Sequence, residues 1–129
     1  MHAELLARGG QLVGAVRTAP TYRLWALPTV PAKPGLIRVA ADGSAVVGER
    51  WRLPAAGFGC FVAGLPAPMT IGSVELADGS RRPGFLVEPY ATAGARDITA
   101  YGGWRAYLAA NGAYADLGQP SVEVSMTNR

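Results

Sequence analysis

Residues 61–107 form the stretch that most constrains how this chain folds. It opens with a loop rich in glycine and proline, Phe61-Val-Ala-Gly-Leu-Pro-Ala-Pro, continues through two apolar segments separated by Asp78-Gly79, and ends in Trp104-Arg-Ala-Tyr-Leu. Asp-Gly between two such segments is a strong signal for a β-hairpin. Irregular glycine-rich backbone lets a ligand approach closely, so the stretch is predicted to form the wall of a binding pocket.

The size and composition of the chain indicate one globular domain. Its 129 residues, 50% of them hydrophobic, suffice to bury a core. Every apolar run is broken by Gly, Pro or Arg before the roughly 20 residues that a membrane-spanning helix needs, so we expect a cytoplasmic protein with no membrane partner. The net charge of +3 comes without a basic stripe bearing interleaved aromatic residues, and no nucleic-acid partner is expected.

Periodicity and turn signals predict short helices and several strands. One helix begins at His2 and stops at Gly9-Gly10, and another follows Pro54 and reaches Val62. Strands are expected at residues 11–16, 22–27, 36–39, 45–53, 71–76 and 82–90. Of these, 36–39 should pair with 45–53 around Asp42-Gly43, and 71–76 with 82–90 around Asp78-Gly79.

The end of the chain is predicted to hold one more helix and a tail. Asp97 is a suitable N-cap for a helix that covers Trp104, Tyr107 and Leu108 and ends near Asn111-Gly112. The tail from Ala113 is polar and unpatterned, as expected of a mobile segment or one docked on a neighbour. The fold class is therefore α+β, with mostly antiparallel strands in a partly closed β-barrel and short flanking helices.

Three polar residues are the candidates for chemistry. Glu88 is predicted to share a strand face with Leu86 and Tyr90, where aliphatic neighbours would suit its carboxylate to proton transfer, so Glu88 and Tyr90 are the catalytic candidates. An exposed glutamate paired with an arginine fits the sequence equally well. Arg23 could hold an anionic substrate through two hydrogen bonds, or could be an ordinary surface arginine.

Other reactive residues are interpreted as inert. The only histidine, His2, lies at a terminus where fraying is expected, and we assign it no role. The only cysteine, Cys60, lies among apolar residues, which favours a buried thiol and excludes an intrachain disulfide. No phosphate-binding loop or dinucleotide fingerprint occurs, and no cofactor or metal is expected.

Seven ordered segments resemble a known family, the C-terminal domain of allophanate hydrolases, which is related to the gamma-glutamylcyclotransferase-like fold. The segments are Thr18-Ala-Pro-Thr-Tyr-Arg-Leu-Trp-Ala-Leu, Pro34-Gly-Leu, Trp51-Arg-Leu-Pro, Phe61-Val-Ala-Gly-Leu-Pro-Ala-Pro, Ile71-Gly-Ser-Val-Glu-Leu-Ala-Asp-Gly, Gly84-Phe-Leu-Val-Glu and Asp97-Ile-Thr-Ala-Tyr-Gly-Gly-Trp-Arg-Ala-Tyr-Leu. The resemblance implies a gamma-glutamylcyclotransferase-like fold, with the domain over residues 1–112 and a tail over 113–129.

The resemblance also implies a place in urea and allophanate metabolism. In the family the domain follows an amidase domain, and it is thought to decarboxylate the N-carboxycarbamate released by allophanate hydrolysis or to organise enzyme assembly. The amidase part is absent here, so this chain alone is not expected to hydrolyse allophanate. The family's opening strand, with a Gly-Ala-His pattern, is absent too, so either the start lies upstream or a neighbouring subunit completes the open edge.

Two functions follow from the resemblance. The first is binding, and possible decarboxylation, of a small carboxylated nitrogen compound in a pocket near Glu88, Tyr90 and Arg23. The residues expected to rim that pocket are Gly64, Leu65, Pro66 and Gly72. The second is a non-catalytic assembly module that docks on a separate amidase or forms a homodimer. Cyclotransferase activity is disfavoured, because the acid/base glutamate of the cyclotransferases aligns within residues 63–68, which hold no carboxylate.

Overall fold

The computed structural model describes residues 2–111 and 123–127. The elements run in the order α1 (His2–Ala7), β1 (Gln11–Arg17), β2 (Tyr22–Leu27), β3 (Lys33–Arg38), β4 (Val47–Arg52), α2 (Ala55–Ala63), β5 (Met69–Glu75), β6 (Arg81–Val87), the 3-10 helix η1 (Pro89–Thr92), β7 (Arg96–Asp97), the 3-10 helix η2 (Thr99–Tyr101), α3 (Trp104–Ala110) and β8 (Glu123–Thr127). No helix within these residues is long and apolar enough to cross a membrane.

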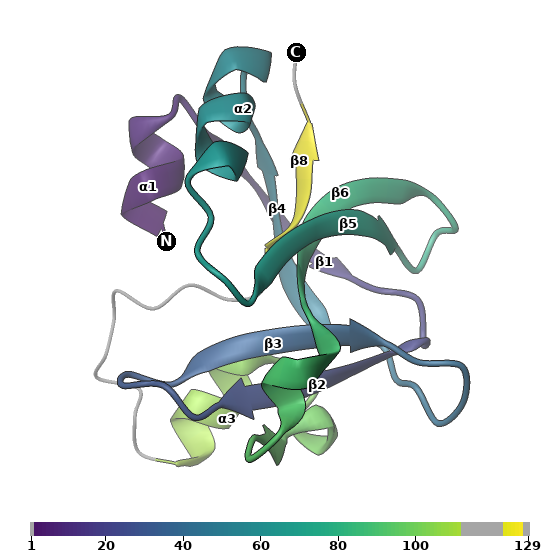
Figure 1. Cartoon of the computed structure of the whole chain (residues 1–129). Coiled ribbons are helices and arrows are strands. Elements are labelled where there is room, and N and C mark those ends of the chain that lie inside the picture. Colours follow the sequence, from purple (N-terminus) through teal and green to yellow (C-terminus); the bar gives the residue numbers. More distant parts are fainter. Residues whose placement is uncertain (1, 112–122, 128–129) are drawn as a thin grey trace.

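The described strands form three small sheets, with strand orders β1-β4-β8, β3-β2-β7 and β5-β6 (Figure 1). Every pair is antiparallel except β4 with β8, which is parallel. This confirms the α+β class with mostly antiparallel strands. The described strands do not close into a barrel, because β1-β4 and β2-β3 pair within separate sheets.

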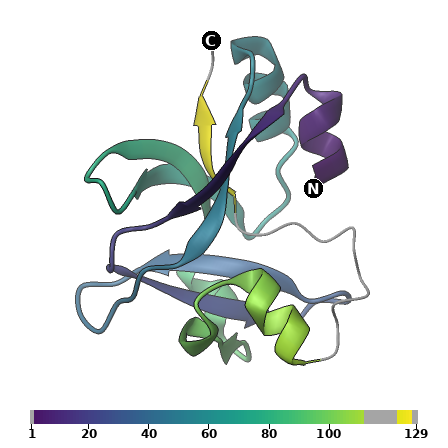
Figure 2. The same ribbon diagram turned by 180° about the vertical axis from the view of Figure 1, so that it is seen from behind.

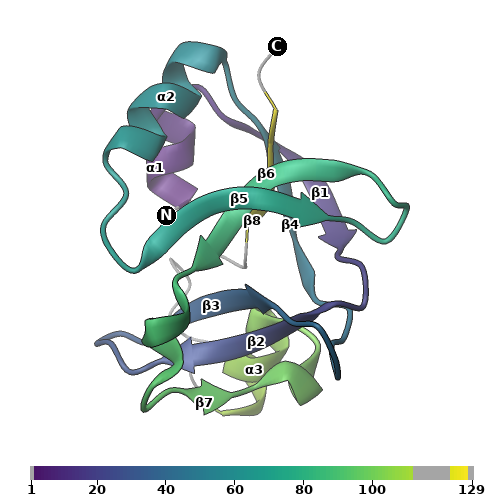
Figure 3. The same cartoon turned by 45° about the vertical axis from the view of Figure 1, so that its right-hand side comes forward.

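Two hydrophobic clusters lie beneath these sheets. The larger one joins the inner face of β2 (Tyr22, Leu24, Ala26) to α3 through Trp104, and α3 covers the sheet of β2 and β3 (Figure 2). The smaller one joins α1, β4, α2 and β6 through Leu5, Trp51, Leu53, Phe61 and Phe85. The β5-β6 hairpin passes above β3, and β6 continues through η1 to β7 beside β2 (Figure 3).

Helices α1 and α2 pack with their backbones in contact. A Cβ atom added at Gly57, in α2, would lie 2.1 Å from the carbonyl oxygen of Arg8, just after α1. Only glycine fits such a distance without moving one of the segments. Gly9 adopts a left-handed conformation with φ 83° and ends α1, as the Gly9-Gly10 pair predicts.

The predicted pairing of residues 36–39 with 45–53 is wrong. Strand β3 pairs with β2, and β4 pairs with β1. The reason lies in the core, since Leu36 packs in the larger cluster whereas Trp51 and Leu53 pack in the smaller one. The Asp42-Gly43 turn does form, with Asp42 at φ 61°, but it connects two sheets instead of closing one hairpin. The hairpin around Asp78-Gly79 is confirmed.

Two predicted boundaries are also corrected. The strand expected to reach Tyr90 ends at Val87, because Pro89 cannot donate a backbone hydrogen bond and instead begins η1. The last helix begins at Trp104, not after Asp97, because Gly102 in a left-handed conformation interrupts the helical backbone. In the predicted tail, residues 123–127 form β8 beside β4, and residues 113–122 lie outside the described residues.

Candidate functional site

The chemically richest group in the described chain surrounds Glu49, the only buried carboxylate among residues 2–111. Glu49 and Trp51 point to the same side of β4 because they are two residues apart on one strand. The Glu49 Oε1 atom accepts a hydrogen bond from Trp51 Nε1 at 3.2 Å and lies 2.9 Å from His2 Nε2. Its Oε2 atom accepts one from Arg105 Nη2 at 3.0 Å. We call His2, Glu49, Trp51 and Arg105 the Glu49 cluster.

Three separate elements bring the Glu49 cluster together. His2 lies on the same face of α1 as Leu5, three residues later, and Leu5 is fully buried in the smaller core. Arg105 reaches Glu49 because α3 starts against β4, where Val47 N donates a hydrogen bond to the carbonyl of Gly102. Burying a carboxylate requires such charged and hydrogen-bonded partners, and this one has them from three directions.

The histidine of the Glu49 cluster is only partly buried. The His2 ring lies 5.1 Å from the Trp51 ring, centroid to centroid, and its side chain is 30% exposed. Because Nε2 faces Glu49, the tautomer and orientation of the ring are fixed by that contact, and Nδ1 is the nitrogen available to a ligand. A histidine oriented by a buried carboxylate is a common arrangement for general acid-base chemistry.

Sequence reasoning assigned no role to His2, and the structure shows it bound to Glu49 instead of frayed. The two residues are 47 positions apart, so no local motif could connect them. The spacing of His2 and Leu5 on one helical face was the available signal. The prediction of a buried thiol at Cys60 is wrong, because this residue is exposed on α2.

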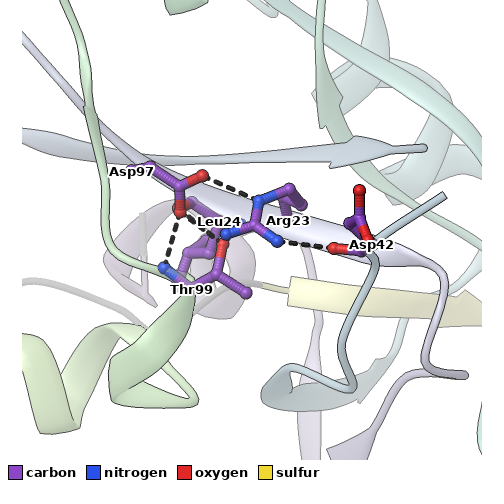
Figure 4. Close-up of polar contacts among 5 residues, drawn as sticks. All are labelled: Arg23, Leu24, Asp42, Asp97 and Thr99. Atoms are coloured by element: carbon purple, nitrogen blue, oxygen red, sulfur yellow. Dashed lines mark hydrogen bonds and ion pairs between the residues drawn. The ribbon is translucent and has the colours of Figure 1, made fainter.

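Arg23 belongs to a second polar group, which lies between β2, β7 and the β3-β4 connection (Figure 4). Its Nε atom donates to Asp97 Oδ2 at 2.7 Å, and its Nη1 atom donates to the carbonyl of Asp42. The other oxygen of Asp97 accepts hydrogen bonds from the backbone N–H and the hydroxyl of Thr99, at 3.0 and 2.6 Å. Asp97 thus binds the first residue of η2 through its side chain, and we call Arg23, Asp42, Asp97 and Thr99 the Asp97 cluster.

Hydrogen bonding controls the ionisation of the Asp97 cluster. Partial burial alone would raise the pKa of Asp97, but the hydrogen bonds from Arg23 and Thr99 outweigh it and lower the pKa below 3.8. The hydrogen bond to Asp97 in turn raises the pKa of Arg23 above its usual value. Arg23 is thus engaged on two sides within the fold.

The other predicted site residues are spread over the surface. Glu88 and Tyr90 are exposed and lie before and within η1, so they do not share a strand face with Leu86. Gly64, Leu65 and Pro66 follow α2, and Gly72 lies in β5 opposite Gly84. The described hydrogen bonds and ion pairs join none of these residues to Arg23. Residues 2–111 and 123–127 contain no group of three His, Cys, Asp or Glu that could hold a metal ion.

Comparison with known proteins gives one consistent family. The sequence model of the allophanate hydrolase C-terminal domain matches residues 1–109. Urea amidolyase of Lachancea kluyveri is 42% identical over 101 residues, which are 74% of this chain and 6% of that enzyme. The chain thus spans a small part of the length of this relative.

Solved structures agree with the sequence match. The structure of Kluyveromyces lactis allophanate hydrolase aligns with a TM-score of 0.81 and 36% identity, over 85% of this chain and 19% of that one. The structure of c4763, a protein specific to uropathogenic E. coli, aligns with a TM-score of 0.77 and 40% identity, over 84% of both chains. Most of c4763 is therefore this one domain.

Proposed function

The chain belongs to the family of allophanate hydrolase C-terminal domains, and from this premise we propose that it binds a small carboxylated nitrogen compound and decarboxylates N-carboxycarbamate. The observation that carries the proposal is the contact between His2 and the buried carboxylate of Glu49. The proposal also includes a gamma-glutamylcyclotransferase-like fold. It places the rim of the binding pocket at Gly64, Leu65, Pro66 and Gly72.

The reaction needs a proton donor near the substrate nitrogen. When N-carboxycarbamate loses carbon dioxide, one C–N bond breaks, its electron pair stays on nitrogen, and the nitrogen takes up a proton to give carbamate. In the proposal, His2 acts as an imidazolium: Nε2–H stays directed to Glu49, Nδ1–H gives its proton to the substrate nitrogen, and Nδ1 then takes up a new proton from solvent. The Trp51 ring is buried behind His2 and packs against the histidine ring, which helps to hold it in place. His2 and Glu49 take the role that the sequence had suggested for Glu88 and Tyr90.

A coupled assay tests this proposal. Allophanate is supplied with a separate allophanate-hydrolysing amidase, and the rate of carbon dioxide release is measured with and without this protein. The protein should increase that rate, and His2→Gln should remove the increase. Loss of the increase in Glu88→Gln, with His2→Gln fully active, would return the proton role to Glu88. An unchanged rate with the native protein would exclude decarboxylation.

The edge of the first sheet favours a second candidate function, assembly on a partner. Among the described strands, β1 pairs only with β4, apart from a hydrogen bond from Ala77 N to the carbonyl of Arg17 at its end. Leu12 and Val13 on β1 are 51% and 48% exposed. Unpaired strand edges with exposed apolar side chains are templates for pairing with another chain. The proposed partners are a second copy of this chain or a separate amidase.

Light scattering coupled to size exclusion tests the assembly function. A homodimer that Val13→Lys converts to a monomer would support pairing through β1. A native monomer that does not co-elute with an allophanate-hydrolysing amidase would contradict it.

A further inference from the structure

The C-terminal strand β8 lies along the edge of β4 that faces away from β1. It runs parallel to β4 and also lies close to β6, so two separate elements contact it (Figure 1). The sequence model of the family matches residues 1–109, and β8 begins only at Glu123. The strand β8 therefore comes from outside the matched part of the chain and returns to the strand that carries Glu49.

Pairing with β8 covers the part of β4 that belongs to the Glu49 cluster. Glu49 pairs with Glu123 and Trp51 with Met126, and the register shifts directly after Glu49. The pairing of β4 with β1 also has a shift in register, next to Trp51. Such irregularities change the direction in which neighbouring side chains point. The direction of the Glu49 carboxylate thus depends on what pairs with both edges of β4.

The C-terminal part of the chain approaches Glu49 in two ways. Arg105, in α3, donates a hydrogen bond to Glu49 Oε2 at 3.0 Å and so constrains the carboxylate itself. The later strand β8 pairs with the backbone at Glu49 and so constrains the point from which the side chain extends. His2 and Trp51 both contact Oε1, at 2.9 and 3.2 Å, so a change in the direction of Glu49 would alter both contacts.

We propose that β8 is a positioning strand for the Glu49 cluster, whose pairing fixes the irregular part of β4 and keeps the Glu49 carboxylate directed at His2 and Trp51. A group that orients a reactive side chain must itself be held by surrounding structure, because small displacements lower reaction rates strongly. Without β8, this part of β4 would be paired with β1 alone. The reaction that the cluster would serve is the proposed decarboxylation, so this inference rests on the proposed function.

The contact between the rings of His2 and Trp51 tests the proposal without any substrate. The chain has one histidine, so its ring protons give a single set of NMR signals. The ring centroids are 5.1 Å apart, which is close enough for a nuclear Overhauser effect between the two rings. The double variant Ser125→Pro/Met126→Pro removes two successive backbone N–H groups of β8 and should abolish this effect. Asn128→Pro is the matched control, since it places a proline just outside β8, and should retain the effect.

A peptide of residues 121–129, added to the double variant, should restore the contact between the rings, because β8 acts through pairing with β4. The amide chemical shifts of β2 and β3 should stay native throughout. The proposal is overturned if the double variant keeps the native ring contact, or if the peptide does not restore a contact that was lost. Changed shifts in β2 and β3 would also overturn it, because β8 would then support the whole fold and not the cluster.

The coupled carbon dioxide assay separates this inference from the proposed function. If both hold, the double variant should lower the protein's contribution to the rate about tenfold, because the histidine is no longer aligned. A native rate in a variant that has lost the ring contact would contradict the role of His2 in decarboxylation, while the lost contact would still support β8 as a positioning strand.

Discussion

The Glu49 and Asp97 clusters are both built from a carboxylate and an arginine. They differ in burial and in whether a side-chain atom remains that could react with a ligand. The Glu49 side chain is 11% exposed and the Asp97 side chain 30%. In the Asp97 cluster, Arg23 Nε and Nη1 and both donors of Thr99 are directed to oxygens of the protein itself, so the cluster fastens β2 to β7 and to η2. In the Glu49 cluster, the carboxylate orients a histidine ring that keeps one nitrogen for other chemistry. Burial together with an unused reactive atom distinguishes a candidate reaction site from a structural ion pair.

The largest expected effect is on the rate of carbon dioxide release in the coupled assay. His2→Gln should lower the protein's contribution about 100-fold, because glutamine can still donate a hydrogen bond to Glu49 but cannot transfer a proton. Asp97→Asn should change the rate less than twofold. A comparable loss in both variants would show that the two clusters do not differ in function, and that Arg23 acts on the substrate.

The next effect is on stability and concerns Glu49. Replacing Glu49 by Ala should lower the free energy of unfolding by about 3 kcal/mol, because it leaves Trp51 Nε1 without its acceptor and removes one charged partner of Arg105. Urea unfolding followed by tryptophan fluorescence measures this value. A loss below about 1 kcal/mol would place the carboxylate in effective contact with solvent.

Asp97→Ala should have a smaller effect on stability. We expect the free energy of unfolding to fall by about 1 kcal/mol. The ion pair with Arg23 is partly exposed, and the variant also removes the acceptor of the Thr99 backbone N–H at the start of η2. The same urea unfolding, applied to Asp97→Ala, Arg23→Ala and the double variant, gives the coupling energy of the pair. A loss equal to that of Glu49→Ala would contradict the ranking of the two clusters.

The smallest effect is the pH dependence contributed by Asp97. Its pKa in the folded protein is lowered from 3.8, so its stabilising contribution is present above the unfolded pKa and is lost as the pH falls through the folded value. The difference in unfolding free energy between the native protein and Asp97→Asn should therefore shrink as the pH falls below about 4. A difference that grows at low pH would show that the folded pKa is raised instead.

Local signals predicted much of the fold. The Gly9-Gly10 stop, the Asp78-Gly79 hairpin and the inner face formed by Tyr22, Leu24 and Ala26 each depend on neighbouring residues, and the structure confirms them. The pairing of β4 was missed because Asp42-Gly43 is an equally good local turn for a hairpin and for a connection between sheets. The strands β3 and β4 pair with different partners because Leu36 packs in one hydrophobic cluster and Trp51 in the other.

The candidate site was much harder to predict than the fold. His2, Glu49 and Arg105 come from α1, β4 and α3, and their meeting depends on how these elements pack. The predicted polar residues were chosen by alternation along one assumed strand, and that assumption failed at Pro89. Arg23 was a candidate for holding an anionic substrate or for an ordinary surface arginine, and its partner in the structure, Asp97, is 74 positions away.

Because Gly57 packs closely against the end of α1, a displacement at that end of the helix also moves its other end. Arg8 lies at one end and His2 about 9 Å away at the other, given the rise of about 1.5 Å per residue. Even one methyl group at position 57 must push the Arg8 end away from α2. A substitution at Gly57 thus changes the position of the His2 ring relative to Glu49 without replacing any residue that contacts His2.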